Sequence, residues 1–273
     1  MPFIPPRYPE SLQRYNRAVA LFGTGDYQPA LYQLEEILHL ESQWLPAWNL
    51  KAVLLGWLNQ CETAEKLYRK ILQRTPDDQN TLANLGNLYY QMNRLAEAEA
   101  VLLPVVEPDT DHIGAGINLS QVYAAQHRLE AGIGLMERLL ARHGESALLR
   151  FSYAQLMSQA ARPQEAIPHY RRCLQLNPDH TLAASNLLAN MPYLSDFDHQ
   201  QFLDASCRYG AQLAARVVPR QQWSNRPDPE RALRIGLVSP DFHDHPVAYF
   251  LAPVLASMEV GDVAFTAYST ADY

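Results

Sequence analysis

The sequence predicts an all-α superhelix of repeated helix–turn–helix units, followed by a short α/β tail. Small residues recur at intervals of 34 along the first two-thirds of the chain, at Ala30, Ala64, Ala98, Gly132 and Ala166. A fixed period with a small residue at one position is typical of stacked helix pairs, because close contact between helices tolerates only a small side chain. After Pro192 the period ends, and short aliphatic runs typical of strands follow near the C-terminus.

Placing the small residue at position 20 of each repeat gives five units, 11–44, 45–78, 79–112, 113–146 and 147–180. Position 8 is then always small, with Ala18, Ala52, Gly86, Ser120 and Ala154, whereas position 24 is large, with Leu34, Tyr68, Leu102, Met136 and Tyr170. Such alternation fits paired helices that pack side chains into each other's grooves. Residues 11–180 therefore resemble the tetratricopeptide repeat family. A sixth first helix follows in register over 181–191, so we expect five full repeats and a half repeat.

Composition excludes several classes of partner. The net charge of −7 and the pI near 5.7 argue against nucleic acid, because phosphate binding needs a basic surface. Six arginines between 208 and 234 are the local exception; we interpret them as a solvated linker, with a polyanion or lipid-headgroup site as the alternative. Three unpaired-looking cysteines and the lack of a secretory signal or membrane-length apolar stretch favour a cytoplasmic protein without a membrane partner.

Amide side chains recur on one stripe of the first helices. Positions 2, 6, 9 and 13 face away from the packing and should line the concave groove of the superhelix. The predicted peptide-binding residues are the amides at positions 6 and 9, namely Asn16, Asn84, Asn118, Asn186, Asn87 and Gln121. An amide offers one acceptor and two donors, which matches the backbone of an extended peptide. The alternative is that these asparagines make hydrogen bonds local to the helices.

The tail follows a different pattern. Residues 193–218 have a helical spacing, and 219–230 contain three prolines among polar residues, which indicates a linker. A strand over 233–239, a helix from Pro246 and a second strand over 263–269 would form one β-α-β unit. The intervening loop lies at the carboxyl end of a strand, where open α/β sheets bind ligands. His245 ends this loop beside a helix N-terminus, whose dipole favours a neutral ring that can accept a proton.

Repeats that lead into Leu-Arg-Ile-Gly-Leu-Val-Ser-Pro-Asp-Phe at 233–242 and His-Pro-Val at 245–247 carry a second resemblance. They are similar to the tetratricopeptide O-linked N-acetylglucosamine transferase family, including its SPINDLY-like members. The resemblance implies a two-lobed GT-B transferase that moves a sugar from a UDP- or GDP-linked donor to Ser or Thr of proteins, without a required metal. It further implies that the repeats recognise acceptor proteins and that His245 is a catalytic residue.

The resemblance divides the chain into an N-terminal extension (1–10), repeats (11–191), a helical linker (192–231) and the start of a catalytic domain (232–273). A two-lobed transferase needs roughly 150–200 residues in each lobe, whereas the sequence ends after one β-α-β unit. We therefore expect the 273-residue chain to be inactive in sugar transfer and to hold neither a cofactor nor a metal. A nucleotide sugar would bind only where the remaining lobes are present. The alternative function is a non-catalytic adaptor whose groove binds proteins.

Overall fold

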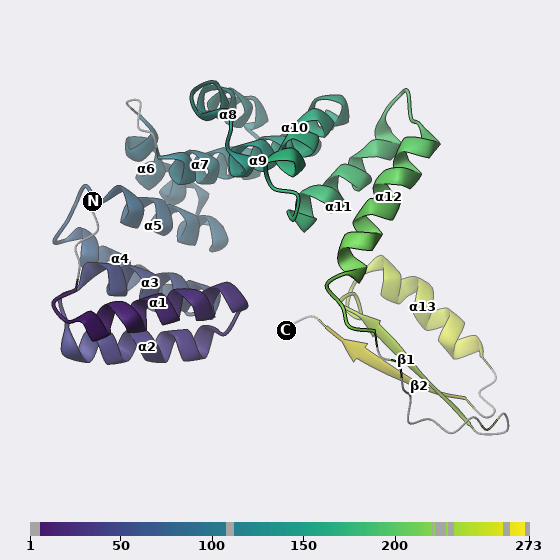
Figure 1. Ribbon diagram of the computed structural model, residues 1–273, viewed down its shortest axis with the longest axis horizontal. Helices are drawn as coiled ribbons and strands as arrows, with labels where there is room; N and C mark the ends of the chain where they lie inside the picture. The colour runs from purple at the N-terminus through teal and green to yellow at the C-terminus, as the bar shows by residue number, and fades with distance from the viewer. Residues whose placement is uncertain are drawn as a thin grey trace. The chain divides into compact units, whose positions relative to one another are not determined.

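The computed structural model describes residues 6–107, 112–219, 221, 228, 232–258 and 263–270. The chain divides into two compact units, Met1–Val217 and Val218–Tyr273. The first unit consists of helices, and the second contains two strands and one helix (Figure 1). Most of the predicted linker at 219–230 lies outside the described residues. No helix in the described ranges is both long and apolar enough to cross a bilayer.

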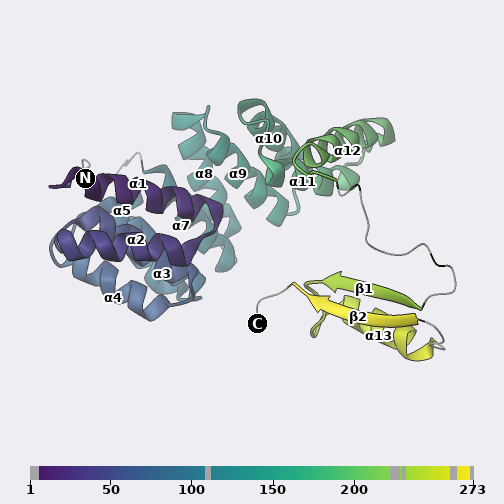
Figure 2. The same cartoon turned by 60° about the horizontal axis from the view of Figure 1, so that its bottom comes forward.

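The first unit is built from consecutive helix pairs. The pairs are α1 (Pro9–Thr24) with α2 (Tyr27–Leu40), α3 (Leu45–Trp57) with α4 (Cys61–Leu72), α5 (Gln79–Gln91) with α6 (Leu95–Val106), α7 (Ile113–Ala125) with α8 (Leu129–His143), and α9 (Ala147–Gln159) with α10 (Pro163–Leu176). From α3 onward, each first helix begins at the first residue of its predicted repeat. Successive pairs lie side by side (Figure 2). The predicted repeat register is therefore confirmed.

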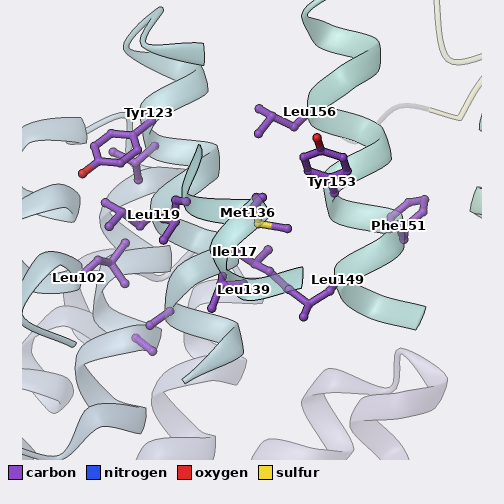
Figure 3. Packing of buried hydrophobic residues seen from close by; sticks show 14 of the residues in the cluster. Leu102, Ile117, Leu119, Tyr123, Met136, Leu139, Leu149, Phe151, Tyr153 and Leu156 are labelled. Atoms are coloured by element: carbon purple, nitrogen blue, oxygen red, sulfur yellow. The ribbon is translucent and has the colours of Figure 1, made fainter. Parts of the chain in front are cut away.

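The predicted small positions are the places where helices approach most closely. All five residues at position 20 are buried, and four of them are alanines with no exposed surface. A Cβ added to Gly132 would lie 3.0 Å from the carbonyl oxygen of Ser120, which leaves no room for a larger side chain. At position 8, a Cβ on Gly86 would lie 2.4 Å from Cγ of Leu102. The large residues of neighbouring repeats fill the remaining space and form two hydrophobic clusters, a smaller one over α1 to α3 and a larger one from α3 to the end of the array, part of which Figure 3 shows.

The turn within each of these five helix pairs contains a residue with left-handed backbone. These residues occupy position 15 of every repeat and have φ between 56° and 84°: Gly25, Asn59, Asn93, His127 and Ala161. In each turn the following N–H donates to a carbonyl five residues earlier, as Arg162 does to Met157 at 2.9 Å. This bond satisfies the end of the first helix. Glycine and asparagine adopt the conformation easily, whereas alanine pays about 1 kcal/mol for it.

Replacing Ala161 with glycine should therefore stabilise the fold. We expect Ala161→Gly to raise the free energy of unfolding by about 0.5–1 kcal/mol, because the strain of the left-handed alanine is relieved. Urea unfolding measures the effect. Ala100→Gly, at an exposed position inside α6, is the control and should lower stability by about 0.5–1 kcal/mol. Equal destabilisation by both substitutions would contradict the proposed strain.

A carboxylate in α4 ties two repeats together. Glu65 has a side chain that is 14% exposed and accepts hydrogen bonds from Arg94 at 2.5 Å and from the Tyr89 hydroxyl at 3.0 Å. The Arg94 guanidinium also lies 4.4 Å from the centre of the Tyr89 ring. The hydrogen bond from Arg94 is the main cause that lowers the pKa of Glu65 below its ordinary value. One repeat later, the Arg128 guanidinium lies over the Tyr123 ring in the same way and donates a hydrogen bond to Glu99, so the arrangement recurs.

Glu65→Gln should destabilise the array in a pH-dependent manner. At pH 7 we expect a loss of about 1–3 kcal/mol, the range for a hydrogen bond to a charged group. Because the folded-state pKa lies below 4.5, the carboxylate stabilises the fold above that pH and loses its contribution as pH falls through the lowered pKa. The difference between wild type and Glu65→Gln, measured by thermal unfolding, should therefore shrink below about pH 4.5.

Glu97→Gln is the matched control, because Glu97 bonds the same arginine but is half exposed. Solvent screens such a pair, so the substitution should change stability much less than Glu65→Gln does. A wild-type to Glu65→Gln difference that stays constant from neutral to acidic pH would show that the carboxylate charge is not what stabilises the contact.

The repeat array ends in a half repeat followed by a helix that packs beside it. Helix α11 (Thr181–Asn190) continues the register, the short 3-10 helix η1 (Met191–Tyr193) ends it, and α12 (His199–Ala214) follows. Helix α12 contacts α11, and Gln212 on α12 donates a hydrogen bond to the carbonyl of Pro178, which precedes α11, at 3.4 Å. Unlike the second helices of the five repeats, α12 buries no residue. The helix predicted within 193–218 is thus present and belongs to the first compact unit.

The second unit is the predicted β-α-β element. Strands β1 (Leu233–Ser239) and β2 (Val263–Ser269) pair in parallel, with α13 (Pro246–Ser257) between them in sequence (Figure 2). The helix begins at Pro246, as expected for a proline in the first turn. None of the described residues in these three elements is fully buried. A parallel pair of strands normally has both faces covered, so the apolar faces of this unit remain open in the described part of the chain.

Candidate functional site

Amide side chains line two hollows on the first helices of neighbouring repeats. One hollow lies between α3 and α5, and Asn84, Asn87 and Gln91 contribute to its lining. The other lies between α7 and α9, has a volume of about 560 Å³ and is lined by Gln121, Gln155 and Gln159 among others. We call the surface formed by these six residues the amide face. It presents hydrogen-bond donors and acceptors without formal charge.

Two of the predicted binding residues join neighbouring first helices. The amide nitrogen of Asn84 donates to the side-chain oxygen of Asn49 on α3 at 2.7 Å. The amide nitrogen of Asn118 donates to the Ala83 carbonyl on α5 at 3.2 Å. These bonds cross from one repeat to the next rather than staying within one helix. Both asparagines therefore use a side-chain N–H donor to join neighbouring repeats.

The other predicted residues differ in position. Asn87 and Gln121 are half-buried and make no hydrogen bond within the part of the chain that the structure describes, so their amides are available to a ligand. Asn16 is exposed on α1 and lines neither hollow. Asn186 on α11 is half-buried and lines neither hollow. The structure thus brings Asn84 together with Asn87 and places Gln121 in the second hollow, away from Asn16 and Asn186.

Sequence reasoning missed half of the amide face. Gln155 occupies position 9 of its repeat, the same position as Asn87 and Gln121, and Gln91 and Gln159 occupy position 13. Positions 9 and 13 are both predicted to face the groove. The repeat register could therefore have identified these three glutamines, because amides recur at position 13 as they do at position 9. None of these three glutamines makes an intramolecular hydrogen bond among the described residues.

His245 lies in the second unit, at the carboxyl end of β1. It is the N-cap of α13, and its Nδ1 accepts the N–H of Val247 at 3.3 Å. Nδ1 also lies 3.9 Å from a carboxylate oxygen of Asp241. A neutral imidazole that accepts at Nδ1 carries its hydrogen on Nε2. In this tautomer the outer nitrogen is a hydrogen-bond donor, and the catalytic role of His245 stays a prediction.

The loop around His245 is held by local hydrogen bonds. The hydroxyl of Ser239 accepts the N–H of Asp241 at 3.0 Å, and the Tyr249 hydroxyl donates to Asp244. The carboxyl ends of both strands meet here, because Thr270 N–H donates to the Ser239 carbonyl at 3.2 Å. No group of three or more potential metal-ligating residues occurs among the residues that the structure describes. The loop therefore presents polar groups at the sheet edge where α/β folds bind ligands.

The hydrogen bonds that Asn84 and Asn118 make between repeats give a stability prediction. Asn84→Ala and Asn118→Ala should each lower the free energy of unfolding by about 0.5–1.5 kcal/mol, because a bond between repeats is lost. Gln121→Ala and Gln155→Ala, which remove no intramolecular bond from the described structure, should leave the melting temperature nearly unchanged. Chemical and thermal unfolding of the four single variants compare the two groups. Equal effects in both would mean that the Asn84 and Asn118 bonds do not stabilise the array.

The repeat assignment agrees with family models. Two tetratricopeptide repeat models match residues 58–121 and 117–181. Over the repeat region, the chain is 32% identical across 96 residues to the "Probable UDP-N-acetylglucosamine–peptide N-acetylglucosaminyltransferase SPINDLY" of Petunia hybrida, and 30% identical across 100 residues to the SPINDLY protein of Oryza sativa. These matches cover 35% and 37% of this chain but only 10% and 11% of the relatives. The chain thus spans about a tenth of the length of the curated relatives that it matches.

Solved structures share the repeat fold. A thermophilic tetratricopeptide repeat protein of Thermus thermophilus aligns with a TM-score of 0.58 at 20% identity, covering 75% of this chain and 99% of that one. An O-GlcNAc transferase of Thermobaculum terrenum aligns with a TM-score of 0.56 at 22% identity, covering 71% of this chain and 37% of that protein. At these identities the likeness concerns the fold. The helical unit is therefore a tetratricopeptide repeat superhelix whose sequence is similar to the repeats of SPINDLY proteins.

Proposed function

We propose that the amide face binds an extended segment of an acceptor protein, and that the chain is the acceptor-binding part of a protein O-glycosyltransferase. One observation carries the binding role. Asn87, Gln121 and Gln155 point unpartnered amides into hollows on neighbouring first helices. The atoms of these amides are not among the buried unpaired polar atoms of the described structure, so they are open to solvent. A row of accessible donors and acceptors that the fold does not use is therefore free to bind the backbone of a ligand.

An extended polypeptide supplies the complementary groups. Each of its residues offers one N–H and one C=O, and an Asn or Gln side chain can bond both. One such hydrogen bond contributes roughly 0.5–1.5 kcal/mol net, so affinity comes from the row rather than from one residue. Recognition through the backbone tolerates many sequences. This suits a surface that presents different proteins to the same reaction.

The transferase role rests on three supports. The repeats are similar in sequence to those of SPINDLY proteins, and the fold resembles that of an O-GlcNAc transferase. The second unit adds a β-α-β element whose loop ends at His245. In the proposed reaction, a sugar passes from a nucleotide sugar to a Ser or Thr hydroxyl. The Nε2–H of His245 would orient the acceptor or the sugar nucleotide by donating a hydrogen bond.

Peptide capture by amide-face variants tests the binding role. We expect Gln121→Ala combined with Gln155→Ala to weaken binding to an array of Ser- and Thr-containing peptides by about tenfold, which corresponds to the loss of two hydrogen bonds. Gln164→Ala is the matched control, because Gln164 is an exposed glutamine on α10 that lines neither hollow. Unchanged capture by the double variant would contradict the amide face as the binding surface.

The glycosyltransferase role is tested on the captured proteins. Proteins bound from a cell extract should be cross-linked, and the contacted peptides mapped for O-linked sugar on Ser or Thr by mass spectrometry. We expect O-glycosylation to be several-fold enriched among wild-type captures relative to captures by the Gln121→Ala, Gln155→Ala variant. Capture that depends on the amide face without any enrichment in O-linked sugar would favour an adaptor over a transferase.

A further inference from the structure

Charge is distributed unequally between the two helices of the repeats. Helices α5, α7 and α11 contain no Asp, Glu, Lys or Arg, and α3 and α9 contain one each. Both exceptions have partners away from the hollows. Lys51 bonds Glu35 on α2 at 2.9 Å, and Arg150 bonds the Gly144 carbonyl at 2.8 Å and the His169 ring at 3.2 Å. In a chain with 19% charged residues, this face is free of formal charge over five consecutive first helices.

An aromatic platform lies at one end of the amide face. Trp57 on α3 lines the same hollow as Asn87 and Gln91, and its side chain is 56% exposed. Its ring contacts those of Phe22 and Tyr27, with centroids 6.1 and 5.8 Å apart. These contacts fix the indole from one side. A large aromatic side chain that is held rigidly yet half exposed is a typical anchor point for a ligand.

The platform follows the register of the amides. Trp57 is at position 13 of its repeat, which is glutamine in the third and fifth repeats, and Val53 is at position 9, which carries an amide in the third to fifth repeats. Position 9 is therefore apolar in the second repeat and amidic in the third to fifth, and position 13 is aromatic in the second repeat and amidic in the third and fifth. A single extended ligand that follows these positions meets an apolar site first and a row of backbone-binding amides next.

We infer that the ligand of the amide face is an uncharged extended polypeptide segment with one apolar side chain that packs on Trp57. The inference rests on the proposed peptide-binding function and names the ligand class. A Lys or Glu in the bound segment would lose water without gaining an opposite charge from α5 or α7, and an unpaired charge is costly to desolvate. Neutral Ser, Thr, Ala and Gly residues have no charge to desolvate. The amide face therefore discriminates against charged segments, because these lose more on desolvation than neutral segments do.

Fluorescent peptides of roughly 12 residues, about 40 Å long when extended, provide the test on the full chain. The reference peptide is made of Ser, Thr, Ala and Gly with one Leu, and variants replace the Leu by Ser or introduce one Lys or one Glu at each position in turn. We expect the Leu peptide to bind about tenfold more tightly than its Ser version. Lys and Glu should each weaken binding at least about tenfold at the central positions.

Trp57→Ala should remove the advantage of Leu over Ser, measured as the ratio of the two peptide affinities on the same variant. Trp57→Phe, which keeps an aromatic ring, should restore part of that advantage. Thermal unfolding of both variants checks that the Phe22 and Tyr27 contacts have not been lost with the fold. Because the Leu to Ser change is made in the peptide, the comparison on wild-type protein stands even where Trp57→Ala is destabilised.

The outcomes separate the two proposals. Peptides that bind through Gln121 and Gln155 but tolerate Lys or Glu equally would overturn the inference and leave the proposed function in place. An advantage of Leu that persists in Trp57→Ala would overturn the anchor. Absence of binding by every peptide in the set would count against the proposed function itself, and the inference would fall with it.

Discussion

The close approach of paired helices at the small positions is the constraint on which the rest of the structure depends. At Gly132 the backbone of one helix lies near the Ser120 carbonyl of its partner, and no side chain larger than a methyl group fits between them. Because small buried residues recur at this position every 34 residues, the two helices of each pair can approach closely. The first helices therefore share one exposed face. Side chains at positions 9 and 13 of the third to fifth repeats therefore line the hollows on this face.

The charged residues that hold the repeats together are separate from the uncharged residues that line the hollows. Charged residues on the second helices and in the turns hold repeats together, as Glu65 on α4 does with Arg94 and Tyr89, while the first helices remain almost free of charge. Long charged side chains are thereby kept away from the hollows. Asn84 belongs to both systems, because its amide nitrogen bonds the neighbouring helix and its side chain also lines a hollow of the amide face.

Several elements were predictable because their signals are local or periodic. Pro246 marks the start of α13, and the aliphatic run from Leu233 predicts β1. The helix boundaries of the repeats follow from the register, since α3, α5, α7, α9 and α11 all begin at position 1. The partners of Asn84 and Asn118 were not predictable, because both bonds join residues about one repeat apart. Which of two outward-facing amides meets a neighbouring helix depends on how the helices pack.

The sequence by itself determined the repeat, its register and the β-α-β order of the tail, because period and side-chain size act through contacts that every repeat makes in the same way. Tertiary structure decided which amides keep unpartnered groups and which are spent on the array. It also decided that Trp57 stays half exposed against Phe22 and Tyr27, and that His245 gives Nδ1 to the cap of α13. These outcomes depend on the few ångströms between neighbouring elements, which composition and spacing do not specify.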